Sequence, residues 1–221
     1  MVDASAYSAD GNCRFVASAG GDLMPDARTI AFYDTAADHY ADLTDTDAPD
    51  ANLLAFMALL PQGGQVLDLG CGPAHASVHM RDAGFRPDPV DASTGMVTLA
   101  NETYDIGARL LTFDAIDMVA AYDGVWANFS LLHAPRAALP IHLDAIATAL
   151  RPQGILHVGM KTGAGELRDR IDRKYTFVTV PELTGLLEDA GFDIIDMVEG
   201  REKGCAGTVD PFVVMRARKH A

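Results

Sequence analysis

The chain has 221 residues, of which 49% are hydrophobic and 22% are charged, a composition that is typical of one soluble folded domain and excludes general disorder. Its formal net charge is −14 and it contains no basic run, so we expect no binding to nucleic acid or to an anionic membrane. The longest apolar run, Leu53 to Leu60, is too short to span a bilayer, and the acidic first residues lack the basic start and apolar core of a signal peptide, which predicts a cytoplasmic protein.

The N-terminal part is predicted to consist of an arm followed by two helices. Residues 1–26 are rich in Gly, Ala, Ser and Asp without a sustained period, which indicates a flexible arm. From Ala27 onward apolar side chains recur at helical spacing, and a second amphipathic stretch runs from about Asp50 to Leu60 before "PQGG" ends it. We therefore expect a single domain over 27–221, made of a helical cap at 27–60 and a core at 64–221.

After this cap, expected strands and helices alternate along the chain. The expected strands are "QVLDLG", "PVDAS", "ARLLTF", "YDGVWAN" and "ILHVGM". The expected helices cover Ala74 to Ala83, Thr94 to Asn101 and the apolar face of Leu139, Leu143, Ile146 and Leu150, with "RPQG" as a turn before the last strand. This alternation predicts a parallel sheet with helices on both faces. Pro87 and Pro89 lack a ladder donor, so the second strand is expected to pair only from about Pro89.

The C-terminal part departs from this alternation. Thr179 and Glu182 form a capping-box pattern at the start of a helix that Gly191 ends. Two apolar strands follow, "FDIIDMV" and "PFVVMRA", and the segment "EGREKGCAGTVD" between them leaves no room for a crossover helix. We therefore expect an antiparallel hairpin at the end of an α/β sheet.

The turn after the first expected strand, in "VLDLGCGPAHAS", carries the clearest chemical signal. Gly70 and Gly72 lack side-chain bulk, so a ligand can approach the backbone there. The helix that begins near Ala74 offers unpaired N–H groups suited to an anion such as a carboxylate. Asp68, two residues before Gly70, would repel a diphosphate and attract an ammonium group. The turn therefore suits a ligand with a cationic end.

Two further carboxylates follow the next two expected strands. Asp91 stands 21 residues after Gly70, about the spacing at which a carboxylate reaches the ribose hydroxyls of an adenosine. Asp114 follows Phe113, so its carboxylate could accept from an adenine amino group while the ring lies on the purine. The three strand ends together predict a site for an adenosine-containing ligand.

Five segments together resemble the class I S-adenosylmethionine-dependent methyltransferases. "VLDLGCGPA" resembles the family's first motif, and "VDASTGMVTLA" resembles the second-strand segment. "YDGVWANFSLLHAPR" and "ALRPQGILHVGMK" are similar to the fourth- and fifth-strand motifs, and "AFYDTAADHYA" is similar to the tyrosine-bearing helix before the core of many small-molecule members. The resemblance implies a Rossmann-like three-layer sandwich, with a mostly parallel seven-stranded sheet that ends in the hairpin.

The resemblance also implies the residues that surround S-adenosylmethionine. Residues of the glycine-rich turn would surround its methionyl part, namely Asp68, Gly70, Cys71, Gly72 and Ala74. Asp91 would hold the ribose, and the adenine would lie among Ala92, Met96, Phe113 and Asp114. Asn128 and Leu131 would close the pocket, and Tyr33 and Tyr40 would cap it. Ala74 departs from the usual third glycine, and Ala76 stands where many relatives carry a polar residue.

Some of these residues have an equally good structural interpretation. Tyr33 and Tyr40 also fit ordinary core packing on an amphipathic helix. Cys71 fits as a small residue in a tight bend better than as a reactive thiol, and the three widely spaced cysteines indicate neither a disulfide framework nor a zinc site. His75 and His79 have the i, i+4 spacing of paired metal ligands, but no third ligand is evident and no metal is expected.

Proton chemistry and acceptor contacts have weaker signals. His133 follows the fourth strand at the ligand edge of the sheet and is the candidate catalytic residue, although it also fits a structural role. His157, in mid-strand, fits a structural role. Lys161 and Tyr175 are candidates for the border of an acceptor pocket.

The resemblance implies transfer of a methyl group, by in-line displacement, to the O, N or S atom of a small-molecule acceptor, with S-adenosylmethionine as the cofactor. The partner is expected to be that acceptor, with the protein as a monomer or homodimer. A regulatory protein that binds the cofactor without catalysis stays open. An NAD-dependent oxidoreductase fits less well, because G-x-G-x-x-G from Gly70 requires a glycine where this chain has His75.

Overall fold

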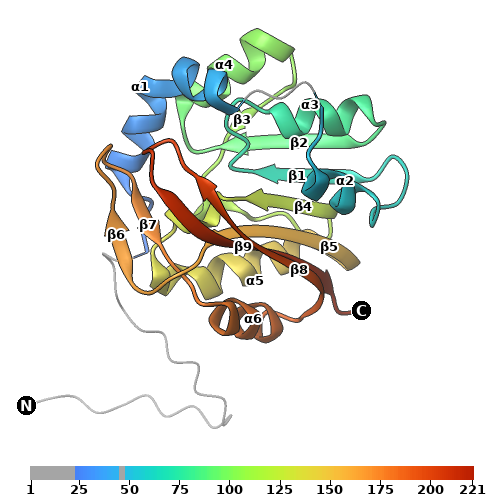
Figure 1. The fold of residues 1–221 in the computed structure, drawn as a ribbon. Coiled ribbons are helices and arrows are strands. Elements are labelled where there is room, and N and C mark those ends of the chain that lie inside the picture. Colours follow the sequence, from blue (N-terminus) through green and yellow to red (C-terminus); the bar gives the residue numbers. More distant parts are fainter. Residues whose placement is uncertain (1–22, 45–47) are drawn as a thin grey trace, which may run out of the picture.

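The computed structural model describes residues 23–44 and 48–221 and has a seven-stranded sheet at its centre (Figure 1). The strands of this sheet lie in the order β3-β2-β1-β4-β5-β9-β8. They are β1 (Gln65–Leu69), β2 (Arg86–Asp91), β3 (Arg109–Leu110), β4 (Tyr122–Asn128), β5 (Leu150–Lys161), β8 (Phe192–Lys203) and β9 (Val209–Lys219). The first five pair in parallel, and β9 pairs antiparallel with both β5 and β8. The mostly parallel sheet with a terminal hairpin is thus confirmed.

Helices cover both faces of the sheet. They are α1 (Ala27–Thr44), α2 (Ala51–Met57), α3 (His75–Asp82), α4 (Thr94–Tyr104), α5 (Leu139–Ala149) and α6 (Val180–Asp189). The predicted capping box at Thr179 and Glu182 is present at the start of α6. Each helix in the described part of the chain is too short or too polar to cross a membrane. Of the predicted arm, residues 1–22, with Cys13, lie outside the described residues.

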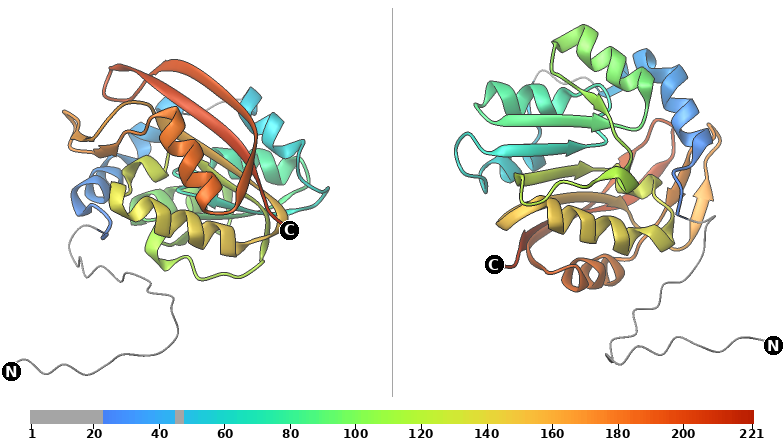
Figure 2. Two further views of the ribbon diagram at one scale, coloured as in Figure 1. Left: turned by 90° about the horizontal axis from the view of Figure 1, so that it is seen from below. Right: turned by 180° about the vertical axis from the view of Figure 1, so that it is seen from behind.

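The alternation of side chains along the strands explains the three layers. Leu67 of β1 and Val125 of β4 point to the face covered by α5 and α6. Val66 and Trp126, one residue away on the same strands, pack with Phe56 of α2 and with α3 on the opposite face. That second face is turned toward the viewer in Figure 1, and the face with α5 is seen from behind in Figure 2. Both layers of helices therefore bury apolar side chains against one sheet.

The second strand departs from expectation. β2 pairs with β1 along its whole length, from Arg86 opposite Gln65 to Val90 opposite Leu69. The N–H of Arg86 donates to Gly64 O on the β1 side, so the nitrogens of Pro87 and Pro89, at alternate positions, face the other neighbour. On that side β3 pairs only with Val90 and Asp91. The prediction that pairing begins near Pro89 was wrong, because neither proline interrupts a ladder.

Other boundaries also differ from the predicted ones. The third strand is reduced to Arg109–Leu110, and the hairpin strands continue through most of the segment predicted as their loop. "RPQG" lies inside β5 as a bulge, with Gln153 at φ +65°, and Leu150 begins that strand instead of ending the preceding helix. These are changes of extent, and they leave the order of the elements as predicted.

A small second sheet was not predicted at all. β6 (Glu166–Arg168) and β7 (Lys174–Thr176) form an antiparallel hairpin between β5 and α6. This hairpin lies beside the N-terminal end of α1, although about 140 residues separate them in the chain (Figure 1). The two segments together cover the carboxyl edge of the parallel strands.

Candidate cofactor and acceptor site

The glycine-rich turn after β1 requires small residues for steric reasons. Gly70 has φ +76°, and a Cβ atom there would lie 2.4 Å from Ser130 Cβ, which follows β4. Gly72 has φ +53° and faces the Tyr40 ring. Ala74 adopts φ +67°, a conformation that glycine takes without strain, which explains why a third glycine is usual at this position.

Asp91 fastens this turn to the end of β2. Its Oδ2 accepts the Gly72 N–H at 2.8 Å, and its Oδ1 accepts the Ser93 N–H at 2.8 Å. Burial raises the pKa of the Asp91 carboxyl, whereas the N–H groups of Ser93 and Gly72 act in the opposite direction. The carboxylate thus sits at the point where the two strand ends meet.

Asp68 is more isolated. Its carboxyl is buried within β1 and accepts a hydrogen bond from Ser77 Oγ of α3 at 2.7 Å. Burial raises the pKa of Asp68 to about 7, although the bond from Ser77 lowers it. A cationic ligand group beside this carboxyl would restore its ionised form.

Two connected compartments open above these residues. The inner compartment, of about 110 Å³, is lined by Asp91, Ala92, Ser93, Met96 and Phe113 together with α1 residues. The outer compartment, of about 410 Å³, reaches Asp68 and Cys71 on one side and Lys161, Arg173 and Tyr175 on the other. Seven residues line both compartments, namely Tyr33, Tyr40, Gly70, Gly72, Asn128, Phe129 and His133. The compartments are therefore two parts of one cavity.

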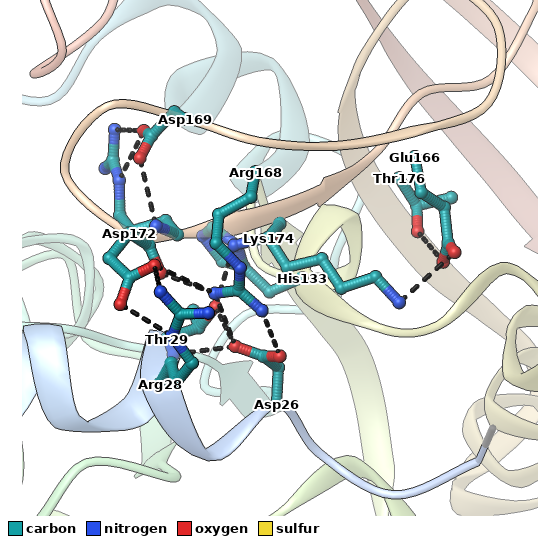
Figure 3. Close-up of polar contacts among 11 residues, drawn as sticks. Asp26, Arg28, Thr29, His133, Glu166, Arg168, Asp169, Asp172, Lys174 and Thr176 are labelled. Carbon is teal, nitrogen blue, oxygen red and sulfur yellow. Dashed lines mark hydrogen bonds and ion pairs between the residues drawn. The ribbon is translucent and has the colours of Figure 1, made fainter. Parts of the chain in front are cut away.

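Helix α1 is fastened across this cavity by the β6–β7 hairpin (Figure 3). Arg168 donates to both carboxylate oxygens of Asp26, at 2.6 and 3.1 Å, and Asp26 in turn caps the first turn of α1. The Lys174 N–H donates to Thr29 Oγ1 at 2.8 Å, and Arg28 pairs with Asp172. We call this set of contacts the α1–hairpin interface.

The same helix is also held at the start of α4. Asp34 Oδ1 accepts from Ser93 Oγ at 2.7 Å and from the Gly95 N–H at 3.0 Å. A Cβ atom on Gly95 would lie 2.6 Å from the Asp34 carbonyl oxygen, so the two helices are in close contact there. Helix α1 therefore crosses the cavity with an attachment on each side.

Tyr33, His133 and Arg173 form a polar cluster at the junction of the compartments. His133 Nε2 lies 2.9 Å from Tyr33 Oη, and His133 Nδ1 lies 2.8 Å from the Lys174 carbonyl oxygen. Arg173 Nη1 donates to Tyr33 Oη at 3.3 Å while Asp169 pairs with the same guanidinium. Burial lowers the pKa of His133 to about 4, so the imidazole is neutral near pH 7.

Most of the site residues predicted from sequence meet at this cavity, but three do not line it among the described residues. Ala74 is buried in a small cluster beneath the turn, and Leu131 belongs to the main core. Asp114 is exposed in a short 3-10 helix at Phe113–Ala115, where its neighbour Phe113 takes the lining position. Their roles toward a cofactor stay predictions.

The histidines and the candidate border residues have clear surroundings. His157 is buried, stacks on Trp126 at 3.7 Å and donates to Asn128 Oδ1, which fits its predicted structural role. Lys161 and Tyr175 both line the outer compartment, with the ammonium 4.2 Å from the ring centre. Within residues 23–44 and 48–221 no cluster of three potential metal ligands includes His75 or His79.

Sequence reasoning missed Arg173 and Ser93, which line the cavity, and their partners Asp169 and Asp34. Arg173 and Asp169 lie in a segment without periodicity, and only the β6–β7 hairpin brings them beside Tyr33. Asp34 and Ser93 carry a partial signal, since Ser93 stands at a predicted helix start, where a serine is a common cap. Their contact with each other spans 59 positions of the chain and has no local pattern.

Residues 39–197 match the sequence pattern of the family described as "Methyltransferase domain". The chain belongs to the class I S-adenosylmethionine-dependent methyltransferases. The architecture agrees, because this methyltransferase shares its fold with many solved structures of the family. No curated protein matches the sequence significantly.

Three solved structures illustrate the similarity of this methyltransferase to other members. A 1,6-didemethyltoxoflavin-N1-methyltransferase of Burkholderia thailandensis, with 1,6-didemethyltoxoflavin and S-adenosylhomocysteine bound, is 26% identical over 87% of this chain and 88% of that one, with a TM-score of 0.68. A Methanosarcina mazei S-adenosylmethionine-dependent methyltransferase is 15% identical over 78% and 99% of the chains, with a TM-score of 0.69. A Haloferax volcanii complex between a methyltransferase and the Trm112 activator gives 17% identity over 87% and 98%, with a TM-score of 0.68. The last two show the fold alone.

Proposed function

We propose that this methyltransferase transfers a methyl group from S-adenosylmethionine to an oxygen, nitrogen or sulfur atom of a small molecule. The observation that carries the proposal is the two-part cavity, in which a compartment beside Asp91 and Phe113 opens into a larger one at Tyr33 and His133. A cofactor and an acceptor can thus lie next to each other under one cover.

The residues of the inner compartment, together with Asp68 on one side of the outer compartment, fit the cofactor. Gly70 and Gly72 leave a surface that a Cβ atom would fill, and Asp91 stands beside it with its carboxylate fixed by two backbone N–H groups. We assign Asp91 to the ribose hydroxyls, Met96 and Phe113 to the adenine, and Asp68 to the cationic amino group. The buried carboxyl of Asp68 is hydrogen-bonded by Ser77 and lacks a cationic partner among the described residues, which supports this assignment.

The side of the outer compartment away from Asp68 supports a small acceptor. It is enclosed by α1, by Tyr175 of β7 and by residues around the β8–β9 turn such as Cys205. The Burkholderia thailandensis relative binds a small molecule, 1,6-didemethyltoxoflavin, which agrees with an acceptor of modest size.

The protein's part in the chemistry is alignment and exclusion of water. When bound, S-adenosylmethionine supplies a methyl group on a sulfonium, which is already a good leaving group. Helix α1 covers the junction where the methyl group and the acceptor would meet, and holding two reactants in line there contributes several kcal/mol to rate. Where the acceptor carries a proton, His133 is the residue on which we expect a proton to end.

Ligand-induced stabilisation tests the cofactor assignment. We expect S-adenosylmethionine and S-adenosylhomocysteine to raise the unfolding temperature and NAD to leave it unchanged, because His75 stands where a dinucleotide turn needs glycine. Stabilisation by NAD alone would overturn the proposal.

Transfer of radiolabelled methyl groups tests catalysis. With purified enzyme and a cell extract, we expect label in the small-molecule fraction. Binding of the cofactor with no transfer to any fraction would instead support a regulatory cofactor-binding protein, and label only in macromolecules would contradict the small-molecule acceptor.

A further inference from the structure

The hydrogen bonds of His133 define its tautomer. The Lys174 carbonyl oxygen, 2.8 Å from Nδ1, can only accept, so Nδ1 carries the proton. In the neutral imidazole Nε2 then has a lone pair and no hydrogen, and it must accept from Tyr33 Oη at 2.9 Å. The phenol hydrogen of Tyr33 therefore points at His133.

This direction leaves the lone pairs of Tyr33 Oη available. Arg173 Nη1 occupies one of them at 3.3 Å, and the oxygen has a second. Tyr33 lines both compartments, so its side chain stands where cofactor and acceptor would meet. An acceptor group that carries a hydrogen can donate it to this oxygen, whereas Nε2 of His133 is already occupied by the phenol.

We propose that Tyr33 is the catalytic residue that takes the acceptor's proton, that His133 receives a proton through it, and that the acceptor's nucleophilic atom is a hydroxyl oxygen or a ring N–H nitrogen. The proposal rests on the function proposed above and narrows its acceptor class. Thiolates and other anions without a proton gain nothing from this arrangement.

The proton balance is as follows. The acceptor's X–H bond breaks and its proton bonds to Tyr33 Oη, while the phenol's own O–H bond breaks and that proton bonds to His133 Nε2. The electron pair left on X is the nucleophile for the methyl group. After product leaves, the imidazolium returns its proton through Tyr33 to water, and both residues are restored.

The surroundings require the two proton movements to be concerted. Burial raises the pKa of Tyr33 to about 12 and lowers that of His133 to about 4, so neither a free phenolate nor a lasting imidazolium is favoured. The charged groups that face His133 are Arg173 and Lys161, which disfavour its protonation, and Asp169, which favours it. The Tyr175 ring, 4.8 Å from the imidazole, completes the enclosure, and Arg173 stabilises negative charge that passes over Tyr33.

Nitrogen NMR of the ¹⁵N-histidine-labelled protein with S-adenosylhomocysteine tests the hydrogen bonds directly, with His133→Gln to assign the signal. We expect a neutral His133 protonated at Nδ1, still neutral near pH 6, and a shift of its Nε2 signal in Tyr33→Phe. A proton on Nε2, or protonation near the ordinary histidine pKa, would overturn the proposal. Failure to bind S-adenosylhomocysteine would instead count against the proposed function.

A matched pair of probes tests the acceptor class. Phenol carries a proton that must be removed, whereas thiophenol ionises without help from the protein. With both present, we expect Tyr33→Phe to lower methylation of phenol by ~100-fold, as for loss of an acid–base group, and to leave thiophenol nearly unchanged. The control is Tyr122→Phe, which removes a phenol hydroxyl bonded to Asp88 and, among the described residues, outside the lining of both compartments. Equal losses for the two probes, or a wild-type enzyme that methylates thiophenol alone, would contradict the relay.

Discussion

Two buried carboxylates at the same edge of the sheet are held in different ways. Asp91 is fixed by backbone N–H groups on both oxygens, so its position is part of the turn. Asp68 accepts a hydrogen bond from the Ser77 hydroxyl, and burial raises the pKa of Asp68 to about 7. Asp91 is therefore held in position for a ligand, whereas Asp68 is the carboxyl whose ionised form a cationic ligand would stabilise most.

Asp68 therefore predicts a pH-dependent affinity for S-adenosylhomocysteine. Below pH 7 the carboxyl must lose its proton before it can pair with the ligand's ammonium group, so affinity rises with pH up to about 7, by at most ~10-fold per pH unit. Calorimetry across this range measures the slope. Asp68→Asn has no proton to lose, so its affinity should be lower and its slope flatter. An identical slope in this variant would assign the titration to another group.

Asp91 predicts a loss of affinity without loss of fold. In Asp91→Asn one of the two backbone N–H groups faces an amide nitrogen, which cannot accept. A charge-assisted hydrogen bond contributes ~1.5–3 kcal/mol, so we expect at least ~10-fold weaker binding of S-adenosylhomocysteine. Circular dichroism should stay close to wild type. Asp117→Asn, at an exposed carboxylate, is the control, and unchanged affinity in Asp91→Asn would remove this residue from the site.

At the scale of elements, the sequence patterns predicted the features that depend on residues close together in the chain. The alternating strands and helices, the capping box of α6 and the terminal hairpin follow from periodicity, and the structure has them. Pairing along β2 was mispredicted because it depends on how short β3 is, and Pro87 gives no information about its neighbour. The β6–β7 hairpin was missed because its partner, α1, lies far away in the sequence. Arg173 was missed for the same reason, because this hairpin brings it into the site.

The α1–hairpin interface predicts control of cofactor release. The Arg168–Asp26 pair is partly buried, at 28% and 19% exposed, and fastens the first turn of α1 over the inner compartment. We expect Arg168→Gln to speed dissociation of S-adenosylhomocysteine several-fold, measured by stopped-flow displacement, because α1 opens more readily.

Arg28→Gln is the matched control for this prediction. Its pair with Asp172 is far more exposed, at 65% and 44%, and exposed pairs contribute little. Equal rates in the two variants would mean that release does not pass through opening of α1 on the hairpin side.

At the scale of the whole molecule, charge is distributed unevenly. The chain carries 31 acidic and 17 basic side chains. Four of the basic ones nevertheless lie around α1 and the β6–β7 hairpin, the two segments that cover the cavity, namely Lys161, Arg168, Arg173 and Lys174. Each has a carboxylate partner there. Attraction between opposite charges thus stabilises the position of α1 and the β6–β7 hairpin over the cavity. Repulsion among the excess carboxylates destabilises the folded chain as a whole.

Salt is therefore predicted to stabilise the folded protein and to weaken the contacts that hold α1 and the β6–β7 hairpin over the cavity. From about 0.1 to 1 M NaCl the Debye length falls from ~10 to ~3 Å, which weakens both repulsion across a molecule of net charge −14 and the partly exposed pairs at α1. We expect Tm of the free protein to rise by a few degrees, since ~1 kcal/mol corresponds to ~2–4 °C in a chain of this size. Over the same range S-adenosylhomocysteine should dissociate faster. Arg168→Gln should keep the first effect and lose most of the second, because its α1–hairpin interface no longer contains the screened pair. If salt speeds dissociation of S-adenosylhomocysteine as much in Arg168→Gln as in wild type, the Arg168–Asp26 ion pair does not control cofactor release.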